Sequence, residues 1–212
     1  MSGRITAIEV QRRNPNRVNI YLDGEFMFGL HRITAAWLTI GQELTDEQIE
    51  NLKSKDLAEV IHQSALRLLN YRQRTTVEMA KRLILKGYEQ DQVKAVVDRL
   101  QQNHLLDDTQ FAESWVNDRI TLHPRSKRLM AYEMMNKGLD GQIVQMALAK
   151  AGEDSQLADA AARKVMRKWT DLAEKEFISH CATFLGRKGF AAGISFSTAR
   201  KLWKELQQEM GQ

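Results

Sequence analysis

The side chains that could bind a charged partner are lysines and arginines, which gather in three groups along the chain. They are Arg72, Arg74, Lys81 and Arg82, then Arg125, Lys127 and Arg128, and then Arg163, Lys164, Arg167 and Lys168. Cations that recur at a regular distance can form a positive stripe, which suits a phosphate backbone or an acidic groove of a protein. The other interpretation is a set of solvated helix faces, because most runs of charge are only that.

Signals for catalysis or for a bound metal are weak in this sequence. There is no glycine-rich loop that could hold phosphates, and no motif that pairs a nucleophile with its base. Glu59 and His62 match half of a carboxylate-bridged metal site, but the second half and two further glutamates are missing. Glu176, His180 and Cys181 fall on adjacent helix positions, yet the cysteine is better interpreted as a core residue. We therefore expect no enzyme activity, no metal and no cofactor.

A repeat places the three basic groups along the chain. A lysine, a glycine and an apolar residue follow one another at Gly87, Gly138 and Gly189, which are 51 residues apart (138 − 87 and 189 − 138). Glycine takes the left-handed conformation that ends a helix, the lysine lies at the negative end of the helix dipole, and the apolar residue folds back. Upstream of the glycines, apolar residues match at three offsets: Met79, Met130 and Cys181; Ala80, Ala131 and Ala182; Leu83, Met134 and Leu185.

Each copy of this repeat is expected to contain three helices. The predicted divisions are 55–104, 105–152 and 153–212, and the first helix of the third copy extends through Trp169. Thr75 with Glu78 predicts a capping box for a second helix, and Asp107 and Asp108 can cap the first helix of the second copy. The sequence thus predicts a mainly α protein of three tandem three-helix repeats, stacked in an elongated, curved array.

Residues 1–54 are expected to form a small antiparallel β-meander followed by short helices. Alternating apolar residues predict three strands, and a bulge or three-residue loop at Asp23-Gly24 would place Val18, Ile20, Leu22, Phe26, Phe28 and Leu30 on one face. A short helix is expected from Ile33 through Trp37. Thr45 and Gln48 predict a capping box for another helix, which ends at about Lys53. So small a sheet should dock its apolar face on a helix.

Composition limits the class of protein. With 212 residues, 43% of them hydrophobic, and only 2 prolines, the chain is long and apolar enough for a core of long helices. The formal net charge is +4, and the excess lies in the repeats. No export signal or membrane-spanning run is evident, and the single cysteine cannot form an internal disulfide. We expect a cytoplasmic protein.

The motifs resemble those of a known family. LLDDTQFAESW, the run PRSKRLMAYEMMNKGLDGQIVQMAL and the helix stop in each repeat are similar to RecX, the regulator of the bacterial RecA recombinase; the resemblance covers residues 55–208. It implies a cytoplasmic modulator, usually an inhibitor, that lies along the groove of the RecA–DNA filament and interferes with ATP hydrolysis and strand exchange. The implied partners are the RecA filament and single- or double-stranded DNA, with no membrane, and the chain is expected to be a monomer.

Other functions stay open on the residues alone. A helical module that binds DNA by itself would show steep salt dependence, whereas an unrelated scaffold would bind neither DNA nor recombinase. Reading of a specific operator by a helix-turn-helix is disfavoured. In the first copy the would-be recognition helix opens with the acidic and amide residues Glu89 to Gln92, and in the second it opens with Asp140 to Gln142. Reading of bases would need arginine or asparagine there, and acidic residues would face phosphates instead.

Overall fold

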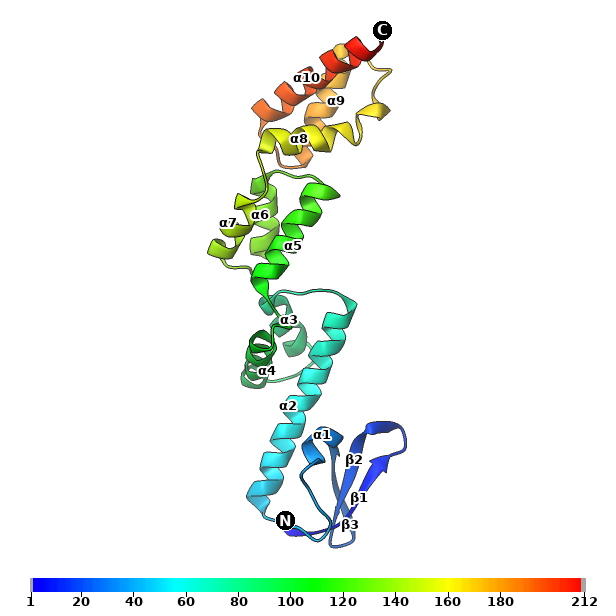
Figure 1. The fold of residues 1–212 in the computed structure, drawn as a ribbon, viewed down its shortest axis with the longest axis vertical. Helices are drawn as coiled ribbons and strands as arrows, with labels where there is room; N and C mark the ends of the chain where they lie inside the picture. Colours follow the sequence, from blue (N-terminus) through cyan, green and yellow to red (C-terminus); the bar gives the residue numbers. More distant parts are fainter. Residues whose placement is uncertain (1, 211–212) are drawn as a thin grey trace. The chain divides into compact units, whose positions relative to one another are not determined.

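The computed structural model describes residues 2–210 and is mainly helical, with a β-sheet at its N-terminal end (Figure 1). The strands are β1 (Gly3–Gln11), β2 (Asn14–Leu22), β3 (Glu25–His31) and β4 (Glu43–Leu44). The helices are α1 (Arg32–Ala35), α2 (Asp46–Tyr71), α3 (Thr76–Ile84), α4 (Gln90–Gln102), α5 (Asp108–Thr121), α6 (Lys127–Asn136), α7 (Gly141–Ala149), α8 (Asp154–Arg163), η1 (Met166–Lys168), α9 (Glu174–Arg187) and α10 (Ala192–Met210). Within the described residues, no helix is both long and apolar enough to cross a membrane.

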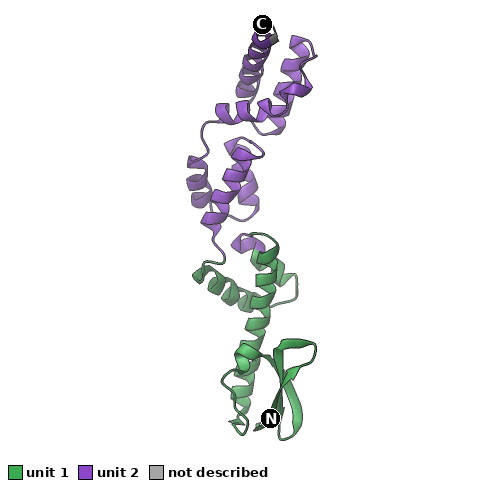
Figure 2. Ribbon diagram, turned by 45° about the vertical axis from the view of Figure 1, so that its right-hand side comes forward, with its two compact units in different colours: residues 1–73, 79–105 green, residues 74–78, 106–212 purple. Residues whose placement is uncertain are grey.

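The chain forms two compact units, coloured separately in Figure 2. Unit 1 contains residues 1–73 and 79–105, and unit 2 contains residues 74–78 and 106–212. The boundary passes through α3, whose first residues belong to unit 2 and whose remainder belongs to unit 1. The predicted divisions at 54, 104 and 152 stay a prediction.

The N-terminal sheet has four strands in the order β3-β2-β1-β4, so β4 adds a strand that the sequence pattern did not indicate. Val18 pairs with Leu30 and Ile20 with Phe28, and a bulge follows between Ile20 and Tyr21. This is the register expected for Val18, Ile20, Phe28 and Leu30. Beyond the bulge Leu22 pairs with Glu25 instead of Phe26, although it is buried on the expected face with the other four.

Phe26 is the exception to that prediction. It is 58% exposed, because beyond the bulge it pairs with Tyr21 and its ring lies edge-on to the tyrosine on the other face. The bulge shifts the alternation by one residue, and one residue is enough to move a side chain to the opposite face.

A helix covers the apolar face of the sheet, as expected. Ile5, Ile20 and Leu30 are fully buried in one cluster with Ile49 from α2 and Ala35 from α1. Fixing the sheet against α2 is what makes so small a sheet stable.

Hydrogen bonds to Asp56 of α2 add a polar tie between the helix and the sheet. The carboxylate of Asp56 accepts from Nη2 of Arg17 at 2.9 Å and from the backbone N–H of His31 at 2.6 Å. Asp56 is buried, so these donors satisfy a carboxylate that water hardly reaches.

The helix that begins at the Thr45 cap does not end at Lys53. The capping box is present, with Oγ1 of Thr45 accepting from the N–H of Gln48, but α2 continues without a break to Tyr71. The prediction of an end was wrong because the polar run Lys53-Ser54-Lys55 contains neither glycine nor proline, and polar residues alone do not stop a helix.

The helices of the repeats are α2–α4, α5–α7 and α8–α10. In the third copy the first helix ends at Arg163 rather than Trp169, and the short 3-10 helix η1 follows. This break accompanies the placement of Trp169 against α9, where its ring lies edge-on to Phe177 and Phe184. Packing of Trp169 against the buried ring of Phe177 and the partly buried ring of Phe184 is a greater gain than another turn of exposed helix.

The glycines of the three helix stops differ in their surroundings. Their φ angles are +92° at Gly87, +83° at Gly138 and +88° at Gly189, all left-handed. A Cβ at Gly138 would come within 2.5 Å of the Cβ of Val77, and one at Gly189 would come within 2.7 Å of the Cβ of Leu129. Nothing lies within 4 Å at Gly87. Glycine is therefore required at positions 138 and 189 for two reasons, the left-handed turn and the close packing of a neighbouring side chain.

Hydrogen bonds at Gly138 and Gly189 also repeat. Oγ1 of Thr75 donates to the carbonyl of Lys137 at 2.6 Å, and 51 residues later the N–H of Ser126 donates to the carbonyl of Lys188 at 3.1 Å. Next to these caps, the N–H groups of Thr76 and Lys127 donate to carboxylates at the start of a first helix, those of Asp108 and Asp154. Within unit 2, two hydrogen bonds thus connect the start of α3 to the second copy, and two equivalent ones connect the start of α6 to the third copy.

Candidate functional site

Two arginines of the second copy, Arg119 and Arg125, meet at one carboxylate, that of Glu133 on α6, and form the basic group around Glu133. Nε of Arg119 donates to Oε2 of Glu133 at 3.1 Å, and Nη1 of Arg125 pairs with Oε1 of the same residue. The guanidinium of Arg119 also stacks over the ring of Trp115, 4.0 Å from its centroid. These contacts hold two guanidinium groups rigidly in place, which favours planar recognition of an anion.

Lys188 adds a third cation to this group. Burial, followed by the positive charges of Arg125 and Arg119, lowers the pKa of Lys188. Burial and the charge of Arg119 likewise lower the pKa of Arg125. Arg119 and Arg125 share the Glu133 carboxylate, and Lys188 lies near enough to be repelled by both, so an anion placed here would relieve repulsion as well as form ion pairs.

Sequence reasoning named Arg125 but missed Arg119 and Lys188. Arg119 comes from the last turn of α5, and Lys188 is the lysine of the third helix stop, where it was interpreted only as a cap. The three cations come from three separate segments of unit 2, and only the tertiary fold shows that they meet.

Lys127 and Arg128 occupy the start of α6, directly after the cap Ser126. The backbone N–H of Lys127 is held by Asp154, and its side chain is half-buried. Arg128 is exposed, and the nearest acceptor of its guanidinium is the carbonyl of Gly189 at 3.5 Å. Both side chains lie where the positive end of the helix dipole adds to their charge.

The first basic group is divided by the fold. Arg74 is only 7% exposed, so it lies in the interior rather than on a partner-binding surface. Arg72, Lys81 and Arg82 are exposed, and the last two are on α3. If the first basic group contributes to a positive stripe on the surface, it does so through Arg72, Lys81 and Arg82.

The third basic group is largely engaged within the protein. Arg163 pairs with Asp159 and with Glu205, each at 2.6 Å, and these carboxylates raise its pKa. Nζ of Lys164 donates to the carbonyl of Thr121 at 2.6 Å. Arg167 and Lys168, on η1, are exposed.

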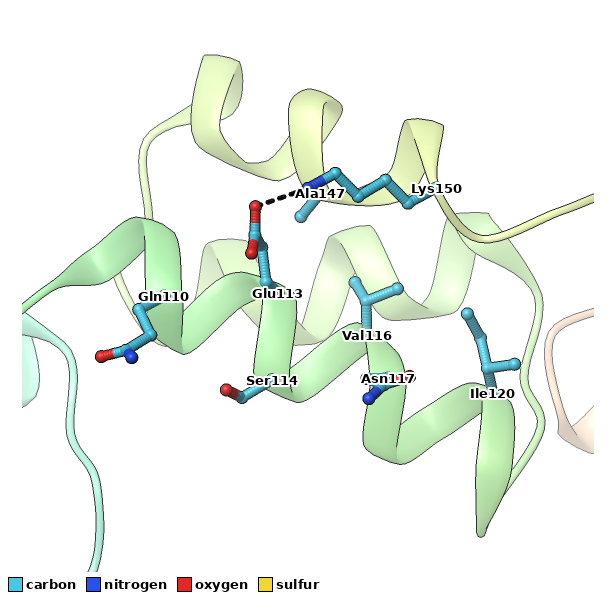
Figure 3. A pocket seen from close by; sticks show the side chains of 8 residues that line it. All are labelled: Gln110, Glu113, Ser114, Val116, Asn117, Ile120, Ala147 and Lys150. Carbon is cyan, nitrogen blue, oxygen red and sulfur yellow. Dashed lines mark hydrogen bonds and ion pairs between the residues drawn. The ribbon is translucent and has the colours of Figure 1, made fainter.

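One ion pair recurs between the first and third helices of every copy. The cation stands twelve residues after each stop glycine: Arg99, Lys150 and Lys201. Its partners are Glu59 at 3.8 Å, Glu113 at 2.7 Å and Asp159 at 2.9 Å, respectively. Figure 3 shows the second of these, which bridges α5 and α7. The regular position of the cation was visible in the sequence but was not used.

The ion pair lies in an open cavity between the two helices. In the second copy this cavity is about 410 Å³ in volume and is lined by Glu113, Lys150 and polar side chains of α5, such as Ser114 and Asn117 (Figure 3). Among the described residues, no group of three or more histidines, cysteines or acidic side chains could hold a metal. Cys181 is fully buried, as expected of a core residue, and burial raises its pKa to about 11.

Comparison with known proteins settles the family. Three family descriptions match successive parts of the chain: "Regulatory protein RecX N-terminal domain" at residues 3–45, "RecX, first three-helix domain" at 62–100 and "RecX, second three-helix domain" at 107–148. The chain belongs to the RecX family of regulatory proteins. The first RecX three-helix domain spans the end of α2 with α3 and α4, and the second spans α5–α7, so Arg119, Arg125 and Glu133 lie in the second of them.

Relatives match the chain over nearly its whole length. It is 30% identical to the regulatory protein RecX of Clostridium perfringens, covering 94% of this chain and 96% of that one. It is 25% identical to the regulatory protein RecX of Listeria welshimeri, over 96% of this chain and 77% of that one. A crystal structure of regulatory protein RecX superimposes with a TM-score of 0.73 at 25% identity, covering 91% of this chain and 96% of that one.

Proposed function

We propose that this chain regulates a RecA recombinase by binding along the recombinase–DNA filament, where it inhibits ATP hydrolysis and strand exchange in recombination and DNA repair. It acts in the cytoplasm as a monomer, without chemistry of its own. Membership of the RecX family supports the regulatory role. The observation that carries the choice of surface is the pair Arg119 and Arg125, which share the carboxylate of Glu133, with Lys188 near enough to feel both positive charges.

This surface suits a repeating partner better than a small molecule. Lys127 and Arg128 extend the positive charge onto the start of α6, next to the rigid guanidinium groups. A filament offers the same acidic or phosphate groups many times, so modest contacts at several places act together as one tight contact. The outward residues of the basic groups, Arg72, Lys81, Arg82, Arg167 and Lys168, would supply further contacts.

The alternative is a module that binds DNA by itself. The same cations would then bind naked duplex or single strands tightly, with an affinity that falls steeply with salt. A titration of duplex DNA without recombinase, at two salt concentrations, separates the two proposals, because only the stand-alone module should bind the duplex tightly.

The test of the proposal is ATP hydrolysis by purified recombinase on single-stranded DNA, measured while the chain is added. Hydrolysis is expected to fall as the chain is added, and the chain alone should hydrolyse no ATP. A rate that stays constant up to a molar excess of the chain would refute the proposal.

A further inference from the structure

A groove in unit 1 consists of residues that do not belong to the basic group around Glu133. Two open cavities, of about 430 and 560 Å³, lie along α2, and both are lined by Ile33 of α1 and Glu59 of α2. They therefore adjoin one another, and the two together are called the groove; Trp37 lines one cavity, and Asn16 and Arg67 line the other.

The groove is positively charged. Arg32, Lys55, Arg67 and Arg99 line it, and its one acidic residue is Glu59, whose side chain is buried. Within the described residues, no carboxylate lies at ion-pair distance from Arg32, Lys55 or Arg67. Three cations are thus free to bind an anion from outside.

Arg99 is held more loosely than its counterparts in the other copies. Its distance to Glu59 is 3.8 Å, against 2.7 Å for Lys150 with Glu113. Gln63 donates to Oε1 of Glu59 at 2.8 Å, while Arg99 faces the other carboxylate oxygen, Oε2, beyond hydrogen-bond distance. The guanidinium of Arg99 can therefore turn toward a ligand at little cost.

Trp37 lines the groove as an exposed aromatic platform. It is 89% exposed, although a tryptophan normally buries most of its surface. Ile33 beside it is 67% exposed. An apolar ring that the fold leaves in water, next to unpaired cations, is the arrangement found where proteins stack the bases of single strands.

We propose that this groove binds single-stranded nucleic acid. A base stacks on Trp37, the phosphates of the strand follow Lys55, Arg99, Arg32 and Arg67, and the amides of Asn16 and Gln63 face the next bases. A duplex fits less well, because its bases have no free face to offer the indole. An acidic peptide would satisfy the cations but would leave the flat face of Trp37 and the amides without a specific use.

The first test replaces the aromatic platform. The full-length chain is titrated with a fluorescent oligothymidylate, and the dissociation constants of Trp37→Ala and Trp37→Phe are compared with that of the unaltered protein. Loss of one stacked base weakens binding about 5- to 150-fold, so Trp37→Ala should fall in this range. Trp37→Phe should retain most of the affinity. Since Trp37 is almost fully exposed, neither change should affect folding.

The second test replaces the cations. In the double variant Lys55→Gln, Arg67→Gln, the plot of log affinity against log salt should become shallower by about 0.7 for each lost phosphate contact. The matched control is Arg200→Gln, Lys204→Gln, which removes the same charge from exposed positions on α10. Its salt dependence should equal that of the unaltered protein.

These tests need no recombinase, so their outcome is separate from that of the proposed regulatory function. An unchanged dissociation constant in Trp37→Ala would overturn the proposal. So would equal binding of a duplex of the same length, or competition by poly-glutamate that is lost in the Trp37→Ala variant, since this would identify an acidic peptide as the occupant.

Discussion

The Cα of Gly138 lies so close to Val77 that a Cβ there would come within 2.5 Å of the Cβ of the valine. Val77 is in the first turns of α3, in the part of that helix that belongs to unit 2. The stop glycine of the second copy therefore serves both to end α6 and to admit the preceding helix.

Gly138→Ala should be markedly destabilising, whereas Gly87→Ala should be mild. Both variants place a side chain at a left-handed φ, which costs about 1–2 kcal/mol. Only the alanine at position 138 also collides with a neighbour, and such overpacking costs about 1–3 kcal/mol more. Urea unfolding of the two variants measures the difference. Equal losses would mean that contact with Val77 does not constrain position 138.

The two caps that join α3 and α6 to the following copies should differ in strength. Ser126→Ala removes the hydrogen bond from Oγ to the N–H of Leu129 and should cost about 1 kcal/mol. Thr75→Ala removes the equivalent bond to Glu78 and also the bond from the hydroxyl to the carbonyl of Lys137, and should cost about 2 kcal/mol.

The control for this pair is Thr75→Ser, which keeps the hydroxyl and should lose little stability. Unfolding free energies from urea titration decide the order of the variants. If Thr75→Ser were as unstable as Thr75→Ala, the methyl group and not the hydroxyl would be the important feature.

Cys181 should make the folded state less stable in alkali. Burial raises the pKa of its thiol from 9.0 to about 11, so the folded state favours the protonated form. The protonated thiol therefore contributes to the free energy of unfolding in full below pH 9. This contribution is lost as the pH rises from 9 through 11, by roughly 2–3 kcal/mol in all.

The measurement is the thermal midpoint between pH 8 and pH 11 for the unaltered chain and for Cys181→Ala. In Cys181→Ala the cavity left by alanine lowers the thermal midpoint by the same amount at every pH. Only the unaltered chain should show the additional fall of its midpoint as the thiol loses its proton. Parallel curves for the two proteins would show that the thiol does not titrate with a raised pKa.

Much of the fold follows from local patterns, because helix caps and left-handed glycines are determined by residues close in sequence. The caps at Thr45, Asp107 and Thr75 are examples, and each accepts the predicted backbone N–H. The exceptions arose where a distant contact decides the outcome. A bulge places Phe26 on the far face of the sheet, and Trp169 packs on α9 instead of continuing α8.

The candidate site was less accessible to sequence reasoning for the same reason. Charge clustering found Arg125 but also included Arg74, which is buried, and Arg163, which is neutralised by two carboxylates. Neither outcome is visible in local sequence, because burial and ion pairing depend on which helices pack together. Arg119 was missed because its partner Glu133 lies on another helix.

Binding to the recombinase filament is the central claim, and co-sedimentation tests it most directly. Filaments are assembled on single-stranded DNA with a slowly hydrolysed ATP analogue and centrifuged with the unaltered chain or with one of two variants. The site variant is Lys127→Gln, Arg128→Gln, which leaves Arg125 and its pair with Glu133 intact. The control is Arg200→Gln, Lys204→Gln.

The account predicts that the unaltered chain and the control sediment with the filament, while the site variant remains mostly in the supernatant with an unchanged circular dichroism spectrum. If the unaltered chain itself stayed in the supernatant at every concentration tested, the chain would not be a filament-binding regulator and the account would be contradicted.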